Sequence, residues 1–214
     1  MTRTEAAPRK RGRPRKTEAE LTETRGRLIR AGVATLTEKG FSAVGIEEIL
    51  QAAAMPKGSF YYYFASKEAF GLELIAAYAG YFARKLDRWF LDETVQPLQR
   101  LVNFTEDARD GMARHGFARG CLVGNLGQEM GTLPESFRAA LMQVFDDWQA
   151  RTAACLRRAQ AAGEIAAGRD CDELAAVFWI GWEGAVLRAK LERRAAPLEI
   201  FARGYFAGLT GNAP

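Results

Sequence analysis

The stretch from Ile46 to Lys67 limits the possible folds of this chain more than any other. Apolar side chains within residues 46–53 recur at the spacing of one helical face, and Pro56 then prevents that helix from continuing. A second short helix follows the turn, because Phe60 and Phe64 stand at positions i and i+4 and so share an inward face. This order of helix, sharp turn and short helix predicts a helix-turn-helix, whose second helix lies in a groove of DNA.

The side chains that the second helix leaves outward fit such a groove. Gly58 and Ser59 are small and let the backbone approach closely, while Lys57 can reach guanine acceptors or phosphate. Tyr61 and Tyr62 can bond phosphate through their hydroxyls and pack their rings on sugar or a thymine methyl group. The other reading, in which tyrosines pack in a core, suits the tyrosine that follows them but cannot hold for both.

Two helix starts complete the predicted DNA contacts of this region. Gly45 is the predicted N-cap of the first helix, and Ser66 that of the helix after the short one. The N-terminal amides of that later helix, together with Lys67, form a ready phosphate site. The later helix runs on into the rest of the chain and is the predicted lever between the two parts.

These motifs resemble the DNA-binding domain of the TetR family of one-component transcriptional regulators. The resemblance rests on Gly40-Phe41, the helix of residues 46–53, the run PKGSFYYYF at 56–64, and Ser66-Lys67-Glu68, all in the family's order. It implies a homodimeric regulator whose two heads bind a palindromic double-stranded DNA operator.

The basic N-terminal segment is a second candidate DNA contact. Residues 1–16 carry seven Arg and Lys side chains against one Glu, although the whole chain has a net charge of only +4. Within this segment Arg11, Arg13 and Arg15 belong to a run that resembles an AT-hook, in which arginines enter a narrow minor groove. The alternative is a solvated charge run that attracts phosphate without reading sequence. Residues 1–19 are predicted to form a disordered basic arm.

The remaining periodicity predicts an all-α protein without strands. Residues 20–68 are expected to form the helix-turn-helix domain, and residues 69–214 a helical bundle for ligand binding and dimerisation. The predicted helices are 20–39, 46–53, a short one within 57–64, 66–91, 97–115, a short one within 116–131, 134–162, one from 170 or 171 to 192, and 197–209.

Enzymatic and metal-dependent functions find little support. The chain has one histidine, His115, and lacks the HExxH, GxxxxGK[ST] and strand-linked GxGxxG patterns. Three scattered cysteines fit neither a disulfide framework nor a structural zinc site. We therefore expect a protein of the reducing cytoplasm without a cofactor or a metal. No apolar run is long enough for a membrane span, and the basic start is not a secretory signal.

One helical face of the predicted bundle carries aromatic and charged residues together. Trp179, Trp182, Glu183, Val186 and Lys190 recur at helical spacing. Such a face suits a dimer interface, where aromatics are enriched, or the wall of a ligand pocket. We expect a split, in which one edge lines the pocket while the other edge and the last helix form the dimer.

A closer resemblance, to the acrylate-responsive and electrophile-responsive repressors of the family, rests on three segments. These are RGCLVGNLGQE at 119–129, WIGWEGA at 179–185 and RAKLE at 188–192. The resemblance is strongest to the acrylate-responsive group and implies acrylate, or a related small carboxylate or electrophile, as the effector.

The chemistry of acrylate suggests which residues would bind it. Its carboxylate needs a cation or an amide donor, and its alkene needs a compact apolar wall. Cys121 has three possible roles: a thiolate that adds to the alkene, a pocket residue without covalent chemistry, or a small buried apolar residue. The expected ligand contacts are Arg119, Cys121, Asn125, Trp148, Trp179, Trp182, Glu183 and Lys190, with Arg188 as a further cation.

Three hypotheses about function follow. The first is a ligand-responsive repressor that a small molecule releases from its operator. The second is a thiol-based electrophile or redox sensor that acts through Cys121. The third is an architectural protein that binds DNA without sequence preference through its basic arm, with an affinity that collapses in salt.

Overall fold

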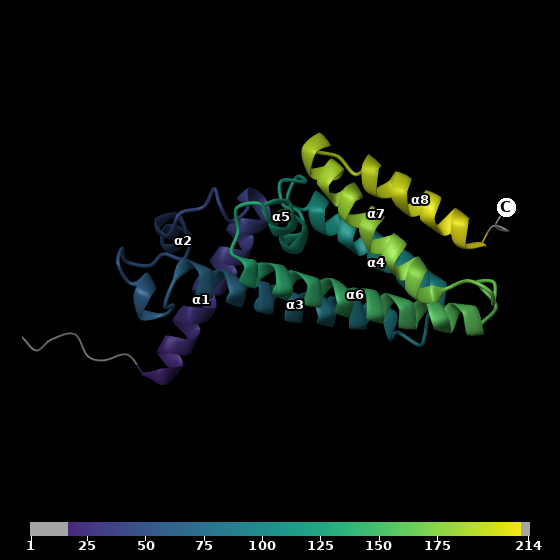
Figure 1. The fold of residues 1–214 in the computed structure, drawn as a ribbon, viewed down its shortest axis with the longest axis horizontal. Helices are drawn as coiled ribbons and strands as arrows, with labels where there is room; N and C mark the ends of the chain where they lie inside the picture. Colours follow the sequence, from purple (N-terminus) through teal and green to yellow (C-terminus); the bar gives the residue numbers. More distant parts are fainter. Residues whose placement is uncertain (1–16, 211–214) are drawn as a thin grey trace, which may run out of the picture.

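The computed structural model describes residues 17–210, and the regular secondary structure in that range is entirely helical. The helix-turn-helix and the bundle expected from the sequence are both present (Figure 1). The elements are α1 (Glu18–Lys39), α2 (Ile46–Ala52), the 3₁₀ turn η1 (Phe60–Tyr62), α3 (Lys67–Phe90), α4 (Pro97–Ala113), α5 (Leu122–Gln128), α6 (Glu135–Ala161), α7 (Cys171–Glu192) and α8 (Ala196–Thr210).

The helix ends lie close to the predicted positions because their caps are local features of the sequence. Thr17 and Glu20 form a reciprocal capping box, so α1 begins at Glu18, inside the range predicted as a disordered arm. Gly40 ends α1 with a φ of +83°, a conformation that favours glycine. The Ser66 hydroxyl accepts a hydrogen bond of 2.9 Å from the Ala69 amide at the start of α3, as predicted.

The second helix of the helix-turn-helix is shorter than an α-helix. It is the single 3₁₀ turn η1, entered from Pro56 through Gly58, whose φ is +82°. Phe60 and Phe64 are buried on its inner side, which confirms the inward face expected from their spacing. Tyr61 and Tyr62 are each 67% exposed, so neither packs in the core.

The long helices α3 and α6 run side by side and form the body of the molecule, with α4, α7 and α8 packed beyond them (Figure 1). The buried side chains form one cluster that extends from α1 and α2 through to α8. Head and bundle therefore share a core. At their junction Gly71 of α3 has no room for a side chain, because an added Cβ would lie 2.3 Å from the Phe137 ring and 2.7 Å from the Phe41 ring.

An apolar face remains uncovered on α7 and α8. Its exposed members recur at helical spacing along α7 and continue on α8; they are Val177, Ile180, Leu187, Leu191 and Ile200. Within residues 17–210, no helix has both the length and the apolar content that a membrane crossing requires.

Candidate functional site

A cavity of about 470 Å³ lies between the head and the bundle. Its wall is built from α1, α3, α4, the loop after α4, and α7. Apolar side chains, including Val33, Phe82 and Val186, supply much of this wall. A volume of several hundred Å³ with a mainly apolar wall and a few polar groups is typical of sites for small organic molecules.

The buried end of the cavity carries three titratable groups in hydrogen-bond contact. The Cys121 thiol, at the N-cap of α5, interacts with the Glu183 carboxyl on α7 and with the Tyr78 hydroxyl on α3. Burial raises the pKa of Glu183 to about 7, an effect that the hydrogen bond from Cys121 only partly offsets. Burial and the neighbouring Glu183 carboxyl hold the pKa of the Cys121 thiol well above its usual range.

Gly124 makes room for the Glu183 carboxyl. An added Cβ at Gly124 would lie 2.1 Å from Oε2 of Glu183 and 3.7 Å from Cβ of Cys121. The amide of Gly124 also donates to Sγ of Cys121 at 3.5 Å. The glycine-rich segment of α5 therefore lets the carboxyl of α7 lie directly against the helix backbone.

Cations line other parts of the cavity wall. Lys85 of α3 forms an ion pair with Asp107 of α4, with its Nζ 3.0 Å from Oδ2, and its side chain is largely buried. Arg119 in the loop after α4 is half-buried. The remaining basic wall residues, Arg30, Arg114 and His115, are exposed. The mouth of the cavity is therefore basic, whereas its buried end holds an acid.

Half of the expected ligand contacts line this cavity. Arg119, Cys121, Trp182 and Glu183 all contribute to the wall. Their role in binding a ligand stays a prediction.

Trp148 and Trp179, two further expected ligand contacts, do not line this cavity. Both indoles are buried in the bundle core, where their ring centroids lie 4.8 Å apart. The Trp179 indole N–H donates to the Thr152 hydroxyl at 2.9 Å. Both indoles are taken up by the packing of α6 against α7, and Trp148 lies behind the cavity residue Phe82, with ring centroids 4.4 Å apart.

The polar contacts expected from Asn125 and Lys190 also lie outside the cavity wall. Asn125 donates from Nδ2 to the carbonyl oxygens of Leu36 and Thr37 at 3.0 and 2.9 Å. Nζ of Lys190 lies 3.4 Å from the Thr37 carbonyl and 3.5 Å from Oδ1 of Asn125. These side chains hold the end of α1. Arg188, the further expected cation, instead pairs with Glu192 on the surface.

Tyr78, Phe82 and Lys85 of α3 line the cavity and were missed in the sequence. Their spacing of four and three residues places them on one face of α3. The sequence did contain a signal for these cavity residues, namely a lysine that continues an aromatic stripe on the inward face of the helix. Which neighbour that stripe faces depends on tertiary packing.

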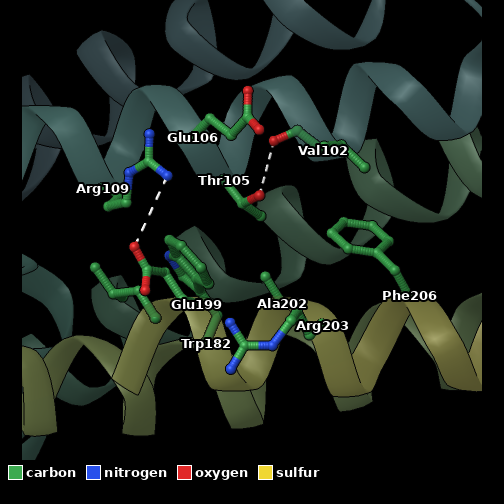
Figure 2. A pocket seen from close by; sticks show the side chains of 10 residues that line it. Val102, Thr105, Glu106, Arg109, Trp182, Glu199, Ala202, Arg203 and Phe206 are labelled. Atoms are coloured by element: carbon green, nitrogen blue, oxygen red, sulfur yellow. Dashed lines mark hydrogen bonds and ion pairs between the residues drawn. The ribbon is translucent and has the colours of Figure 1, made fainter. Parts of the chain in front are cut away.

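A second hollow, of about 420 Å³, lies between α4 and α8. Figure 2 shows Arg109 and Glu106 on one side and Glu199, Arg203 and Phe206 on the other, with the Trp182 indole at the back. Arg109 and Glu199 span it at 4.0 Å. Trp182 lines both this hollow and the larger cavity and therefore lies between the two spaces.

The head presents its predicted reading residues to solvent. The Lys57 side chain is 82% exposed, and its Nζ lies 3.2 Å from Oε2 of Glu47 on α2. Gly58 has nothing within 4 Å of an added Cβ, and Gly45 is equally open at the N-cap of α2. Ser59 precedes η1 and donates its hydroxyl to the Pro56 carbonyl at 2.8 Å. Together with Tyr61 and Tyr62, these residues form an exposed polar edge.

Lys67 was expected to be available for a contact with phosphate, but its side chain is bound within the protein. Its Nζ donates to the Phe41 carbonyl at 3.0 Å and lies 4.4 Å from the centroid of the Phe41 ring. Burial lowers the pKa of Lys67. The lysine therefore fastens the turn after α1 to the start of α3. Arg11, Arg13 and Arg15 lie outside the described residues.

The short helix α5 connects the cavity to the head. Its N-cap, Cys121, lies at the buried end of the cavity. At its other end the Glu129 carboxylate accepts hydrogen bonds from the amides of Phe41 and Ser42 at 2.9 and 2.7 Å. Gly40 permits this contact, since an added Cβ would lie 2.0 Å from Oε1 of Glu129. A shift of α5 caused at the cavity would therefore move the turn between α1 and α2.

Within the part of the chain that the structure describes, no three His, Cys, Asp or Glu side chains come close enough together to hold a metal ion. The described residues offer two candidate binding surfaces, an exposed polar edge on the head and a cavity of a size that suits a small molecule.

Comparison with known proteins adds independent findings. Residues 28–74 match the family described as "Bacterial regulatory proteins, tetR family", and residues 97–205 match "Tetracyclin repressor-like, C-terminal domain". The chain is 61% identical to the transcriptional regulator AcuR of Cereibacter sphaeroides, over 92% of this chain and 89% of that protein. It is 33% identical to the transcriptional repressor DhaR of a Mycobacterium species, over 88% of this chain and 93% of that one.

A solved structure has the same fold. The crystal structure of a regulatory protein TetR from Rhodobacter sphaeroides superposes with a TM-score of 0.84 at 62% identity, covering 86% of this chain and 97% of that one. The likeness extends through both the head and the bundle.

The contact between Glu129 and the head predicts a measurable local stabilisation. Glu129→Ala removes the acceptor of the Phe41 and Ser42 amides, and we expect hydrogen exchange at these two amides to accelerate, with a loss of about 1–2 kcal/mol in the free energy of unfolding. The matched control is Glu135→Ala, which removes an exposed carboxylate paired with Arg138 on α6. Equal exchange in both variants would show that the carboxylate does not hold the turn.

Proposed function

The chain belongs to the TetR family of ligand-responsive, DNA-binding transcriptional repressors, and from that premise we propose that acrylate or a related small carboxylate is its effector. The effector would occupy the cavity next to Cys121 and Glu183, and its binding would release the protein from a palindromic operator. The observation that carries this proposal is that one set of helices with a shared core holds both a mainly apolar cavity and an exposed reading edge.

The reading edge supports sequence-specific DNA binding by the head. Two tyrosines and Lys57 project from a short turn whose inner phenylalanines are buried, so the turn is fixed while its outer edge stays free. Regulators of this kind place such an element in the major groove, and members of the family act as dimers on two half-sites. An architectural protein that binds DNA without sequence preference would need only the basic segment of residues 1–16. That hypothesis gives no role to the exposed edge of the head.

The cavity supports a small effector with both apolar and polar parts. Trp182 and Val186 offer a compact apolar wall beside Glu183 and Cys121, and Arg119 offers a cation. The sequence resemblance to acrylate-responsive repressors selects acrylate among the ligands that such a wall accepts. Sensing by covalent addition at Cys121 is less favoured, because the raised pKa of its thiol keeps the thiolate scarce in the free protein.

Two elements can carry the signal from the cavity to the head. Helix α3 lines the cavity with Tyr78 and starts in the head at Lys67. Helix α5 begins at the cavity and ends at the Glu129 contact with Phe41. An effector that prefers one arrangement of these helices shifts the spacing of the two heads only by as much as its affinity differs between the arrangements.

The uncovered apolar face of α7 and α8 is our candidate for the dimer interface. Its exposed residues lie on the opposite side of α7 from those that line the cavity, and they are different residues from the face of Trp179 to Lys190 that the sequence suggested for both roles. An apolar face of this kind is more often an interface than free surface. In a dimer built on this face, helix α7 would separate each cavity from the partner subunit.

Operator binding should depend on Lys57. Lys57→Ala removes a contact to guanine or phosphate, and we expect about a tenfold loss of operator affinity in a gel-shift assay with the DNA upstream of its own gene. Arg157→Ala is the matched control, because it removes the same charge from an exposed residue in the last two turns of α6, outside the helix-turn-helix. Equal losses in both variants would indicate a long-range charge effect and no direct contact.

Acrylate should release the operator, whereas propionate should not. Propionate has the same carboxylate and chain length but lacks the planar alkene, so it fits a flat aromatic wall less well. The measurement is a gel shift at constant protein and DNA concentrations with increasing ligand. Release by both acids at the same concentration would show that the protein does not recognise the alkene. Release by neither acid would show that small carboxylates of this class are not its effectors.

Dimerisation should depend on Ile180, which is 76% exposed on α7. Ile180→Asp places a charge in the proposed interface, and we expect sedimentation analysis to show monomers that no longer bind the operator tightly. Met142→Asp on the exposed side of α6 is the control and should leave the dimer intact. A dimeric Ile180→Asp variant would show that the interface lies elsewhere.

A further inference from the structure

The buried end of the effector cavity has an unusual electrostatic character for a site that takes an anion. Among the residues that line the cavity, Glu183 is the single acidic side chain, and it lies beside Cys121 and Tyr78, away from the exposed basic mouth. Its carboxyl is fixed in place, since Oε2 occupies the space that a side chain at Gly124 would need. Glu183 also lines the cavity, so its side chain borders the space that a ligand would occupy.

No basic side chain within residues 17–210 forms an ion pair with this carboxyl. Lys85 on α3 is engaged by Asp107, and Lys190, further along α7, donates to Thr37 and Asn125. The remaining charged or titratable groups that line the cavity are Arg30 of α1, Tyr78 and Tyr81 of α3, Arg114 and His115 after α4, Arg119 in the following loop, and Cys121 before α5.

Among the described residues, Cys121 stabilises the ionised carboxyl through its thiol hydrogen bond. Burial outweighs this contact and raises the pKa of Glu183 to about 7. Near neutral pH, about half of the free molecules therefore carry a neutral carboxyl that can donate a hydrogen bond, and the other half carry an anion that repels carboxylates.

We propose that a small carboxylate effector binds against the protonated form of Glu183, so that the two carboxyl groups share one proton and Glu183 is a specificity-determining residue of the cavity. This inference rests on the proposed function, whose effector class it deepens. The ionised protein takes up one proton from solvent when it binds the anion, and no covalent bond forms or breaks. The neutral carboxyl donates its O–H to an oxygen of the ligand.

The sign of the pH dependence follows from this arrangement. Well below pH 7 Glu183 is already protonated, and the affinity for acrylate is at its maximum and constant. Above that pH the proton must be taken up on binding, and the affinity falls by about tenfold for each pH unit. A neutral ligand with its own N–H donors, such as acrylamide, can instead donate to the ionised carboxyl and loses no affinity as the pH rises.

The experiment measures the affinity of the full chain for acrylate and for acrylamide between pH 6 and pH 8.5, by calorimetry in two buffers of different ionisation enthalpy. We expect acrylate binding to take up close to one proton at the alkaline end, with the tenfold slope. In Glu183→Gln the amide is a permanent donor of similar shape, so acrylate should bind with an affinity that no longer depends on pH.

His115 is the control for a competing explanation, because histidine also changes its charge between pH 5 and 8 and an imidazolium attracts anions. His115→Gln should keep the alkaline slope. The inference is overturned if the wild-type affinity for acrylate is independent of pH, if Glu183→Gln keeps the slope, or if His115→Gln abolishes it. Circular dichroism and the operator gel shift verify that each variant folds.

Failure of this inference is distinguishable from failure of the proposed function. If acrylate releases the operator with an affinity that does not vary with pH, only the proton sharing is lost. If acrylate binds at no pH while the operator shift persists, the carboxylate effector and this inference fail together and the DNA-binding function remains. If no operator shift is found, the proposed function itself fails.

Discussion

The carbonyl oxygen of Thr37, near the end of α1, accepts hydrogen bonds from the Gly120 amide, Asn125 and Lys190, at 3.0, 2.9 and 3.4 Å. The last carbonyls of a helix have no partner within the helix, so α1 depends on donors from elsewhere. All three donors come from the bundle. Removing these donors while the contact stays closed would leave buried carbonyls unpaired, at a cost of about 1–3 kcal/mol for each group.

These hydrogen bonds connect the cavity to the head. The segment that supplies Gly120 and Asn125 also supplies Cys121 at the cavity, so any ligand that displaces this segment acts on the end of α1. Glu129 extends the same connection to the turn before α2. Helix α3 offers a parallel route, and the Gly71 contact with Phe41 and Phe137 shows how tightly it is packed at the junction.

The cavity divides its polar groups according to depth. Cations at the mouth are exposed and are screened by solvent, so they attract anions without holding them strongly. The acid at the buried end is desolvated, and its protonation decides whether it repels or binds a carboxylate. Trp182 closes the wall between this cavity and the hollow beside α8, which places one indole in contact with both spaces.

The sequence by itself determined the helices, their caps, the helix-turn-helix and the family. Capping residues such as Ser66 and breakers such as Pro56 act on their immediate neighbours, and the inward spacing of Phe60 and Phe64 needs no distant partner. Only tertiary structure decided which side of an aromatic helix faces the cavity. Helical spacing places Trp179 and Trp182 near one face, but α6 covers the first and leaves the second at the cavity wall. It likewise turned Asn125, Lys190 and Lys67 toward backbone carbonyls, because the unpaired groups they satisfy belong to elements distant in the chain.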